Sequence, residues 1–307
     1  MAKRFSGGTS RPAVGFKCRL GNWQEEAASY DEECKSFLEK KKAGELSVLK
    51  KIKRLSASLQ PATLSKSEDG YLHFGQRVMI VNERTGGFLC ADVGDKTEKT
   101  TGVSFACATG PSYDSCVRNV FHLCRPINDD SFGSDTVIHF GQPVTVKVDA
   151  SLSQLCPVKH GNQDRYLHSE IRSPISFAKF SNYQQVLFCP TTSANTVWKI
   201  FHVDPRVRFE TEGCPVPANT PIVIKHAQTD QMLASSPKVN YRNDYGVEYE
   251  VHCKSYLATN KTQNLIAEAC GRTTSDIDLR QQETENNWMI ITADTHSESQ
   301  ASSTTES

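Results

Sequence analysis

Histidine and cysteine are the residue types in this chain most able to do chemistry, since they act as metal ligands, bases and nucleophiles. Two of the nine histidines, His73 and His139, stand in the same tetrapeptide, His-Phe-Gly-Gln. A repeated histidine could supply paired ligands or paired bases. Because each one precedes Phe-Gly at the start of a strand-like segment, we instead predict that both cap a turn.

No other set of residues forms a recognised catalytic or metal-binding motif. The eleven cysteines are scattered without a Cys-x-x-Cys pair, which is typical of free thiols in a reducing compartment. The sequence has no Walker A, G-x-G-x-x-G, H-E-x-x-H or G-x-S-x-G pattern. We therefore predict no enzymatic activity, metal, cofactor or small-molecule substrate. An enzyme without a recognised motif is a competing class.

The repeated tetrapeptide opens two of three similar segments, which are residues 73–81, 139–147 and 219–226. Each segment begins at a turn-forming residue and continues with alternating apolar positions, as a half-buried strand does. Each unit also closes alike, with an aromatic residue two positions before an aliphatic one. These aromatics are Phe121, Trp198 and Trp288, and we predict that they form the structural core.

The spacing of the units favours a closed fold. Val78 and Val144 are 66 residues apart, and Val144 and Ile222 are 78 apart, whereas solenoid repeats keep a fixed period. We predict a mainly β protein with a β-trefoil of three pseudo-repeats, preceded by an N-terminal α-helical segment. A β-sandwich in which the likeness of the segments is chance is the alternative.

Composition divides the chain into four parts. Residues 1–21 are predicted to be a basic extended arm, residues 22–60 a helical segment, residues 71–293 the trefoil, and residues 294–307 a disordered tail rich in serine and threonine. The helical segment begins at the N-cap Asn22, is interrupted at Gly44 and ends at Pro61. It is either an α-hairpin or a bent helix.

The front of the chain is basic, although the formal net charge is zero. An apolar stripe on the helices, including Tyr30, Phe37 and Ile52, needs the flank of the trefoil or another protein to cover it. An anionic partner fits the basic side chains, but the run lacks the motif of a nucleic-acid site. The predicted partner-binding residues are Arg4, Arg11, Lys17, Arg19, Lys35, Lys40, Lys41, Lys42, Lys50, Lys51, Lys53 and Arg54.

Membrane and lectin functions find little support in the sequence. No apolar run approaches the ~18–20 residues that span a bilayer, and the basic N-terminus lacks the apolar stretch of a signal peptide. We therefore expect a cytosolic protein that binds no membrane. Trefoil lectins commonly carry Gln-x-Trp, which occurs nowhere in this chain. A cytosolic trefoil that binds a glycan or another ligand is the alternative function.

Several strings in the sequence are similar to the cilia- and flagella-associated protein 161 family. They are LGNWQEE at residues 20–26, EDGYLHFG at 68–75, DPRVRFE at 204–210 and EGCPVPAN at 212–219. The resemblance covers roughly residues 20–293. The opening Gly75-Gln76-Arg77-Val78 also resembles an MIR-type trefoil repeat, in which Gly-Asp-x-Val is common. Gln76 and Gln142 replace that acid here, which weakens any transfer of MIR ligand binding.

The resemblance implies a non-enzymatic microtubule inner protein of the motile axoneme. Its partners would be α/β-tubulin and other microtubule inner proteins in the lumen of the doublet microtubule, within the A-tubule. On this basis we predict that residues 1–60 are the main attachment and that the trefoil acts as a rigid spacer with secondary contacts.

Overall fold

The computed structural model describes residues 23–99, 102–127, 135–154, 164–258, 266, 269–271 and 281–293. The chain divides into two compact units, 1–54 and 55–307. The predicted arm of residues 1–21, the N-cap Asn22 and the predicted tail of residues 294–307 lie outside the described residues. The boundary between the units falls inside a helix, so the last turn of that helix belongs to the trefoil unit.

The first unit holds α1 (Trp23–Lys42) and the start of α2 (Ser47–Ser58). Gly44 ends α1, with a φ of 66° that glycine adopts at no steric cost. The Gly44 N–H donates to the Lys41 carbonyl (3.2 Å) and the Glu45 N–H to the Lys40 carbonyl (2.8 Å). This pair of bonds is the Schellman motif, which satisfies carbonyls left open at the helix end. The segment is thus two helices separated by a capped turn.

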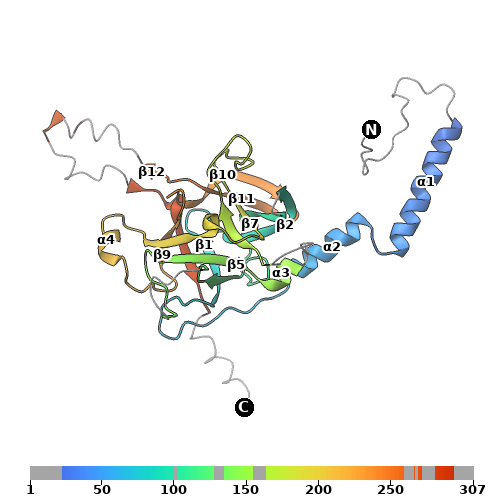
Figure 1. Cartoon of the computed structure of the whole chain (residues 1–307). Helices are drawn as coiled ribbons and strands as arrows, with labels where there is room; N and C mark the ends of the chain where they lie inside the picture. Colours follow the sequence, from blue (N-terminus) through green and yellow to red (C-terminus); the bar gives the residue numbers. More distant parts are fainter. Residues whose placement is uncertain are drawn as a thin grey trace, which may run out of the picture. The chain divides into compact units, whose positions relative to one another are not determined.

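The second unit holds the strands of the described residues (Figure 1). Twelve of them form one sheet, in three sets of four. The first set is β1 (Arg77–Asn82), β2 (Phe88–Lys99), β3 (Gly102–Gly110) and β4 (Phe121–Cys124). The second is β5 (Pro143–Val148), β6 (Tyr166–Ser169), β7 (Gln184–Cys189) and β8 (Trp198–His202). The third is β9 (Pro221–His226), β10 (Leu233–Asn243), β11 (Gly246–Cys253) and β14 (Asn287–Ile291).

Shorter elements lie between these strands. They are α3 (Ala150–Gln154), α4 (Arg208–Thr211), the pair β12 (Leu257–Ala258) and β13 (Gln281–Gln282), and two 3-10 turns at Ala194–Thr196 and Thr284–Asn286.

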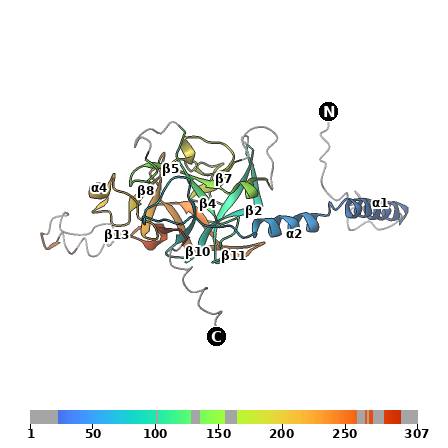
Figure 2. The same cartoon turned by 90° about the horizontal axis from the view of Figure 1, so that it is seen from below.

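Strand pairing closes the unit into a trefoil. The first and last strands of each set pair with each other, as β1–β4, β5–β8 and β9–β14. The pairs β4–β5, β8–β9 and β14–β1 join the sets into a closed ring of six strands. The middle strands meet in a triangle of β3–β7, β7–β11 and β11–β3. This pattern confirms the predicted β-trefoil, and the β-sandwich alternative is wrong (Figures 1 and 2).

Pseudo-threefold symmetry extends to single hydrogen bonds between the segments that precede β1, β5 and β9. The Leu72 N–H donates to the Val216 carbonyl (2.9 Å), the Ile138 N–H to Leu72 (2.8 Å) and the Val216 N–H to Ile138 (2.8 Å). All three side chains are fully buried. This ring of bonds satisfies buried backbone groups and ties the three units together.

The turns that follow this ring need a left-handed residue. Gly75, Gly141 and Asn219 occupy equivalent positions, with φ angles of 89°, 81° and 57°. Glycine adopts this conformation freely, and asparagine tolerates it better than most residues. Their N–H groups donate to the carbonyls of Leu123, Ile200 and Ile290, on the closing strand of each set. The turn therefore locks the start of each unit to its end.

Glutamine caps two of these turns, which corrects the prediction that the histidines do so. The Gln76 Oε1 accepts the backbone N–H of His73 (3.0 Å), and the Gln142 Oε1 accepts that of His139 (2.9 Å). The histidine rings instead approach Asp69 (3.0 Å) and Asp135 (3.8 Å).

The third unit achieves the same turn differently. Pro217 stands where the other units have histidine and has no N–H to donate. The Thr220 hydroxyl instead donates to the Pro217 carbonyl (3.1 Å).

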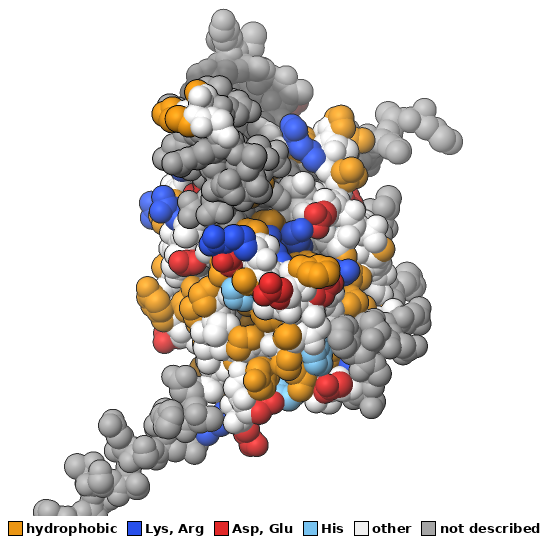
Figure 3. Space-filling model, turned by 90° about the vertical axis from the view of Figure 1, so that its left-hand side faces the viewer, with side chains coloured by type: hydrophobic (Ala, Val, Ile, Leu, Met, Phe, Trp, Pro, Cys, Tyr) orange, Lys and Arg blue, Asp and Glu red, His pale blue; other side chains and the backbone are white. Residues whose placement is uncertain are grey.

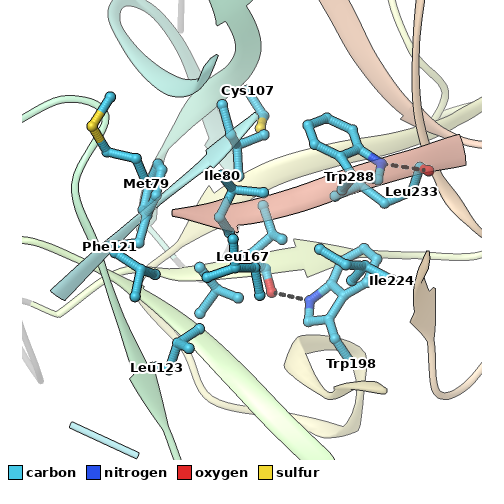
Figure 4. Close-up of a cluster of buried hydrophobic side chains, with 14 of the residues drawn as sticks. Met79, Ile80, Cys107, Phe121, Leu123, Leu167, Trp198, Ile224, Leu233 and Trp288 are labelled. Atoms are coloured by element: carbon cyan, nitrogen blue, oxygen red, sulfur yellow. Dashed lines mark hydrogen bonds between the residues drawn. The ribbon is translucent and has the colours of Figure 1, made fainter. Parts of the chain in front are cut away.

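The closing aromatics lie in the core (Figure 4). Phe121, Trp198 and Trp288 are fully buried. The Trp198 indole N–H donates to the Leu167 carbonyl and the Trp288 N–H to the Leu233 carbonyl, both at 2.9 Å. Phe121 has no such donor and stacks on Phe188, with ring centroids 5.3 Å apart. Burial of each ring stabilises the fold by roughly 1.5–3 kcal/mol.

Candidate interaction surface

Helices α1 and α2 carry an apolar stripe that their own unit does not cover. From Gln24 to Ala57, a range that the structure describes throughout, no side chain is buried. Tyr30 is 68% exposed, Phe37 50% and Ile52 56%. The α-hairpin alternative would bury these side chains against each other, so the helices do not form a packed hairpin. The stripe is available to a partner.

Apolar and basic side chains lie on different faces of α2. With 3.6 residues per turn, Val48, Ile52 and Leu55 fall on one face of the helix. Lys50 and Arg54 fall on the opposite face. This helix contains four bases and no acid, so it combines an apolar contact surface with a concentrated positive charge.

Helix α1 is charged differently along its length. Its sequence holds six acids and four lysines, and five of the acids lie at residues 25–33. Lys35 follows this acidic stretch directly, whereas Lys40, Lys41 and Lys42 lie in the last turn, where they complement the helix dipole. Apart from Lys35, the positive charge of these two helices is therefore found at the end of α1 and on α2.

The predicted partner-binding residues are thus only partly brought together. Arg4, Arg11, Lys17 and Arg19 lie outside the described residues. Lys35 stands apart from the other bases, next to the acidic stretch. The remaining residues, Lys40, Lys41, Lys42, Lys50, Lys51, Lys53 and Arg54, lie on the last turn of α1 and on α2. Lys50 also forms an exposed ion pair with Glu45 (3.6 Å), which contributes at most about 1 kcal/mol.

Isolated helices of this length are only marginally stable in water. Nucleation is costly, and helices shorter than ~12–15 residues rarely persist without tertiary packing. Helix α2 has twelve residues and exposes Val48, Leu49 and Ile52. A partner that covers this stripe would stabilise the helix while it binds.

The C-terminal end of α2 belongs to the trefoil unit and is tightly held there. Ser58 is fully buried, and its hydroxyl lies 2.9 Å from the Tyr245 hydroxyl. The Arg118 N–H donates to the Ser58 carbonyl (3.1 Å). Sequence analysis missed this anchor because Ser58 and Tyr245 are 187 positions apart.

A buried ion pair lies beneath the anchor. The Arg118 guanidinium lies 3.4 Å from the centroid of the Tyr245 ring and donates to Glu248 (2.7 Å). Both charged side chains are almost fully buried. Burial raises the pKa of the Tyr245 hydroxyl, and also that of the Cys90 thiol, which accepts a further bond from Arg118 (3.1 Å). These thiol and phenol groups stay protonated, which suits a structural role.

The loop between β6 and β7 presents a second exposed apolar surface. Ile171 is 74% exposed and Ile175 96%. The loop is held from below, since the backbone N–H groups of Phe180 and Ser181 both donate to the Glu250 carboxylate (2.8 Å each). The loop therefore has an anchored C-terminal end and offers exposed apolar side chains to a partner.

A cavity of about 490 Å³ lies between the β4–β5 and β7–β8 connections. Its cation, Arg125, donates to the Asp135 carbonyl and lies over the Phe74 ring. Its Thr145 hydroxyl donates to the Cys124 carbonyl, and its Thr196 hydroxyl to the Ser193 carbonyl. These three polar groups already bond to the protein itself, which leaves them less available to a ligand.

The face of the trefoil that carries α4 is mixed in character. Figure 3 shows hydrophobic side chains gathered there among histidine and acidic ones. Phe209 of α4 is 88% exposed. Among the described residues, no group of three or more His, Cys, Asp or Glu side chains could hold a metal ion, and no helix is long and apolar enough to cross a membrane.

Solved structures with a similar fold are distant. The SDF2-like protein from Arabidopsis thaliana gives a TM-score of 0.48 at 13% identity, covering 72% of this chain and 94% of that one. A protein O-mannosyltransferase complex from S. cerevisiae gives a TM-score of 0.45 at 14% identity, and the match covers 75% of this chain and 26% of that one. Neither likeness carries a functional argument.

Sequence relatives are much closer. Residues 96–265 match the family described as cilia- and flagella-associated protein 161-like domain. The chain is 30% identical over 263 residues to cilia- and flagella-associated protein 161 of Danio rerio, covering 80% of this chain and 83% of the relative. The Mus musculus protein of the same name is 29% identical over 300 residues, and the match covers 92% of this chain and 88% of the relative. The chain belongs to the cilia- and flagella-associated protein 161 family and is a protein associated with cilia and flagella.

Proposed function

We propose that this protein is a non-enzymatic structural component of the axoneme, which binds tubulin as a microtubule inner protein in the lumen of the doublet microtubule. The observation that carries the proposal is the exposed helical segment, where uncovered apolar side chains accompany the acid-free, basic helix α2. Membership of a cilium- and flagellum-associated family supports the same conclusion.

The surface of tubulin is acidic, which suits the basic end of α1 and the basic face of α2. Exposed ion pairs contribute only ~0–1 kcal/mol each and weaken with salt. The charges therefore steer and orient the encounter, while burial of the apolar stripe sets the lifetime of the complex. Phe37, Leu38 and Ile52, each at least half exposed, are the apolar anchors.

The trefoil contributes a rigid body and a secondary contact. Its ring of six strands leaves no open edge among the barrel strands, and its β6–β7 loop exposes Ile171 and Ile175. Such a body spans a confined space without needing a catalytic site.

Incorporation of charge-reversed protein into axonemes tests the proposal. We expect the triple variant Lys40→Glu, Lys50→Glu, Arg54→Glu to lose most of its occupancy in doublet microtubules, as measured by cryo-EM of axonemes from cells that express it. A matched control reverses three exposed bases of the trefoil that lie outside the β6–β7 loop, Lys66→Glu, Lys238→Glu and Arg242→Glu, and should retain occupancy. Normal occupancy of the helix variant with loss in the control would place the attachment on the trefoil and overturn the proposal.

A further inference from the structure

We infer that the helical segment also binds a second copy of this chain, with α1 of one copy packing on α2 of the next. This inference goes beyond tubulin binding and does not depend on it. The two helices differ in the charge that borders their apolar stripes, and the difference is complementary.

On α1, acids border the stripe. Residues three or four positions apart are neighbours on a helix surface. Glu26 and Glu33 lie four residues before Tyr30 and Phe37, and so border one edge of the stripe. Asp31 borders the other edge. The first three turns of α1 therefore present an apolar stripe between carboxylates.

On α2, lysines border the stripe. Lys51 lies three residues after Val48 and four before Leu55, on one edge. Lys53 lies four residues after Leu49, on the other edge. Oppositely charged residues that flank an apolar seam set partner choice and orientation in paired helices. The stripe of α2 therefore matches that of α1 in both apolar character and charge.

The charge pattern favours pairing between copies over pairing within one chain. At about 1.5 Å per residue, α1 is about 30 Å long and α2 about 18 Å. Folded back through the short turn at residues 43–46, α2 would lie beside the C-terminal half of α1. Its bases would then lie close to Lys40, Lys41 and Lys42 of α1, and Glu26 would lie beyond the reach of α2. A second copy can instead place its α2 beside the acidic half.

This pairing leaves one unused α1 and one unused α2 in a pair of copies. Such a head-to-tail contact continues into a chain of molecules unless two copies exchange helices reciprocally. The opposite face of α2, with Lys50 and Arg54, stays free of the helix pairing and is available to an acidic surface. Pairing therefore leaves the basic face of α2 accessible for attachment, whereas the apolar stripe of α2 can be covered by only one partner at a time.

Sedimentation of the purified full-length protein, without tubulin, tests the inference. We expect the wild type to self-associate with rising concentration and more weakly at high salt. Two double variants reverse the bordering charges. The α1 variant carries Glu26→Lys and Glu33→Lys, and the α2 variant carries Lys51→Glu and Lys53→Glu. Each double variant should weaken association about tenfold. Mixed together, they should associate again, because each variant supplies the charge that the other now requires.

Matched controls reverse the same number of charges on the opposite faces. The α1 control carries Glu25→Lys and Glu32→Lys, and the α2 control carries Lys50→Glu and Arg54→Glu. Both double variants should self-associate like the wild type. A wild type that stays monomeric up to its highest soluble concentration would overturn the inference, as would controls that lose association equally or a mixture that fails to recover it. Because tubulin is absent, none of these outcomes bears on the proposed attachment to microtubules.

Discussion

The trefoil and the helical segment place their apolar side chains in opposite ways. In the trefoil, closing aromatics such as Trp198 and Trp288 are fully buried. In the helical segment, residues 24–57 bury no side chain at all. A closed ring of strands buries its own apolar side chains, whereas two short amphipathic helices need a second surface to cover theirs. The trefoil therefore carries the stability of the fold, and under the proposed function the helices carry the binding, so mutations should separate the two.

The largest expected effect is loss of a core aromatic. Trp288→Ala should lower the free energy of unfolding by ~3–5 kcal/mol, because it leaves a cavity and removes the indole donor from the Leu233 carbonyl. Chemical denaturation of the full-length protein measures the change. A loss below about 1 kcal/mol would place Trp288 outside the cooperative core and break the comparison.

The next largest effect concerns the buried ion pair. Arg118→Met should cost ~3–5 kcal/mol at neutral pH, because it leaves the Glu248 carboxylate buried without its cation. The double variant with Glu248→Gln should recover part of that loss, since no buried charge is then uncompensated. Denaturation of both variants distinguishes this reason from simple loss of packing, for which the second substitution would bring no recovery.

Acid should destabilise the trefoil through His252. Burial, with Lys254 nearby, lowers the pKa of this histidine to about 4. The unfolded chain, with a pKa near 6.5, therefore takes up a proton that the folded chain excludes between about pH 6.5 and pH 4. The stability conferred by the neutral ring is present above pH 6.5 and is lost as pH falls through this window, by up to about 3 kcal/mol.

Replacement of this histidine checks the pH dependence. We expect the difference in unfolding free energy between the wild type and His252→Gln to shrink as pH falls from 7 to 4. A difference that stays constant across this range would show that the ring takes up its proton as readily in the folded state as in the unfolded chain.

The smallest effect on stability belongs to the helices. Ile52→Ser should change the free energy of unfolding of the trefoil by less than about 0.5 kcal/mol, because Ile52 is 56% exposed. The same substitution should reduce occupancy in doublet microtubules. Equal loss of stability in Ile52→Ser and Trp288→Ala would mean that the helices and the trefoil fold as one unit.

Local pattern made much of the fold predictable. Apolar positions alternate after residues 75, 141 and 219, and an aromatic residue closes each unit. Both features recur because every unit buries the same face of its strands and returns to the same axis. Gly44 ended a helix as predicted, since a left-handed residue is what a Schellman cap requires. The acidic half of α1 is equally readable from the sequence, since five of its six acids lie at residues 25–33.

Other features depend on residues that are distant in the chain. Arg118 and Glu248 are 130 positions apart, and no local pattern shows that a basic and an acidic residue will meet in a dry core. Ser58 is a serine at the end of a helix, and nothing near it in the sequence shows that its hydroxyl will meet that of Tyr245. The cap formed by Gln76 likewise depends on the fold of one turn rather than on residue type, which is why histidine was the wrong candidate.

Three units that close on one another, and the helices that precede them, follow from the amino-acid sequence, because strand alternation, turn residues and helix caps act over a few positions. The burial of particular charges, the identity of the capping residues and the exposure of particular apolar side chains follow from the folded arrangement. Those outcomes depend on contacts between distant segments, whose energies arise only once water has been excluded from between them.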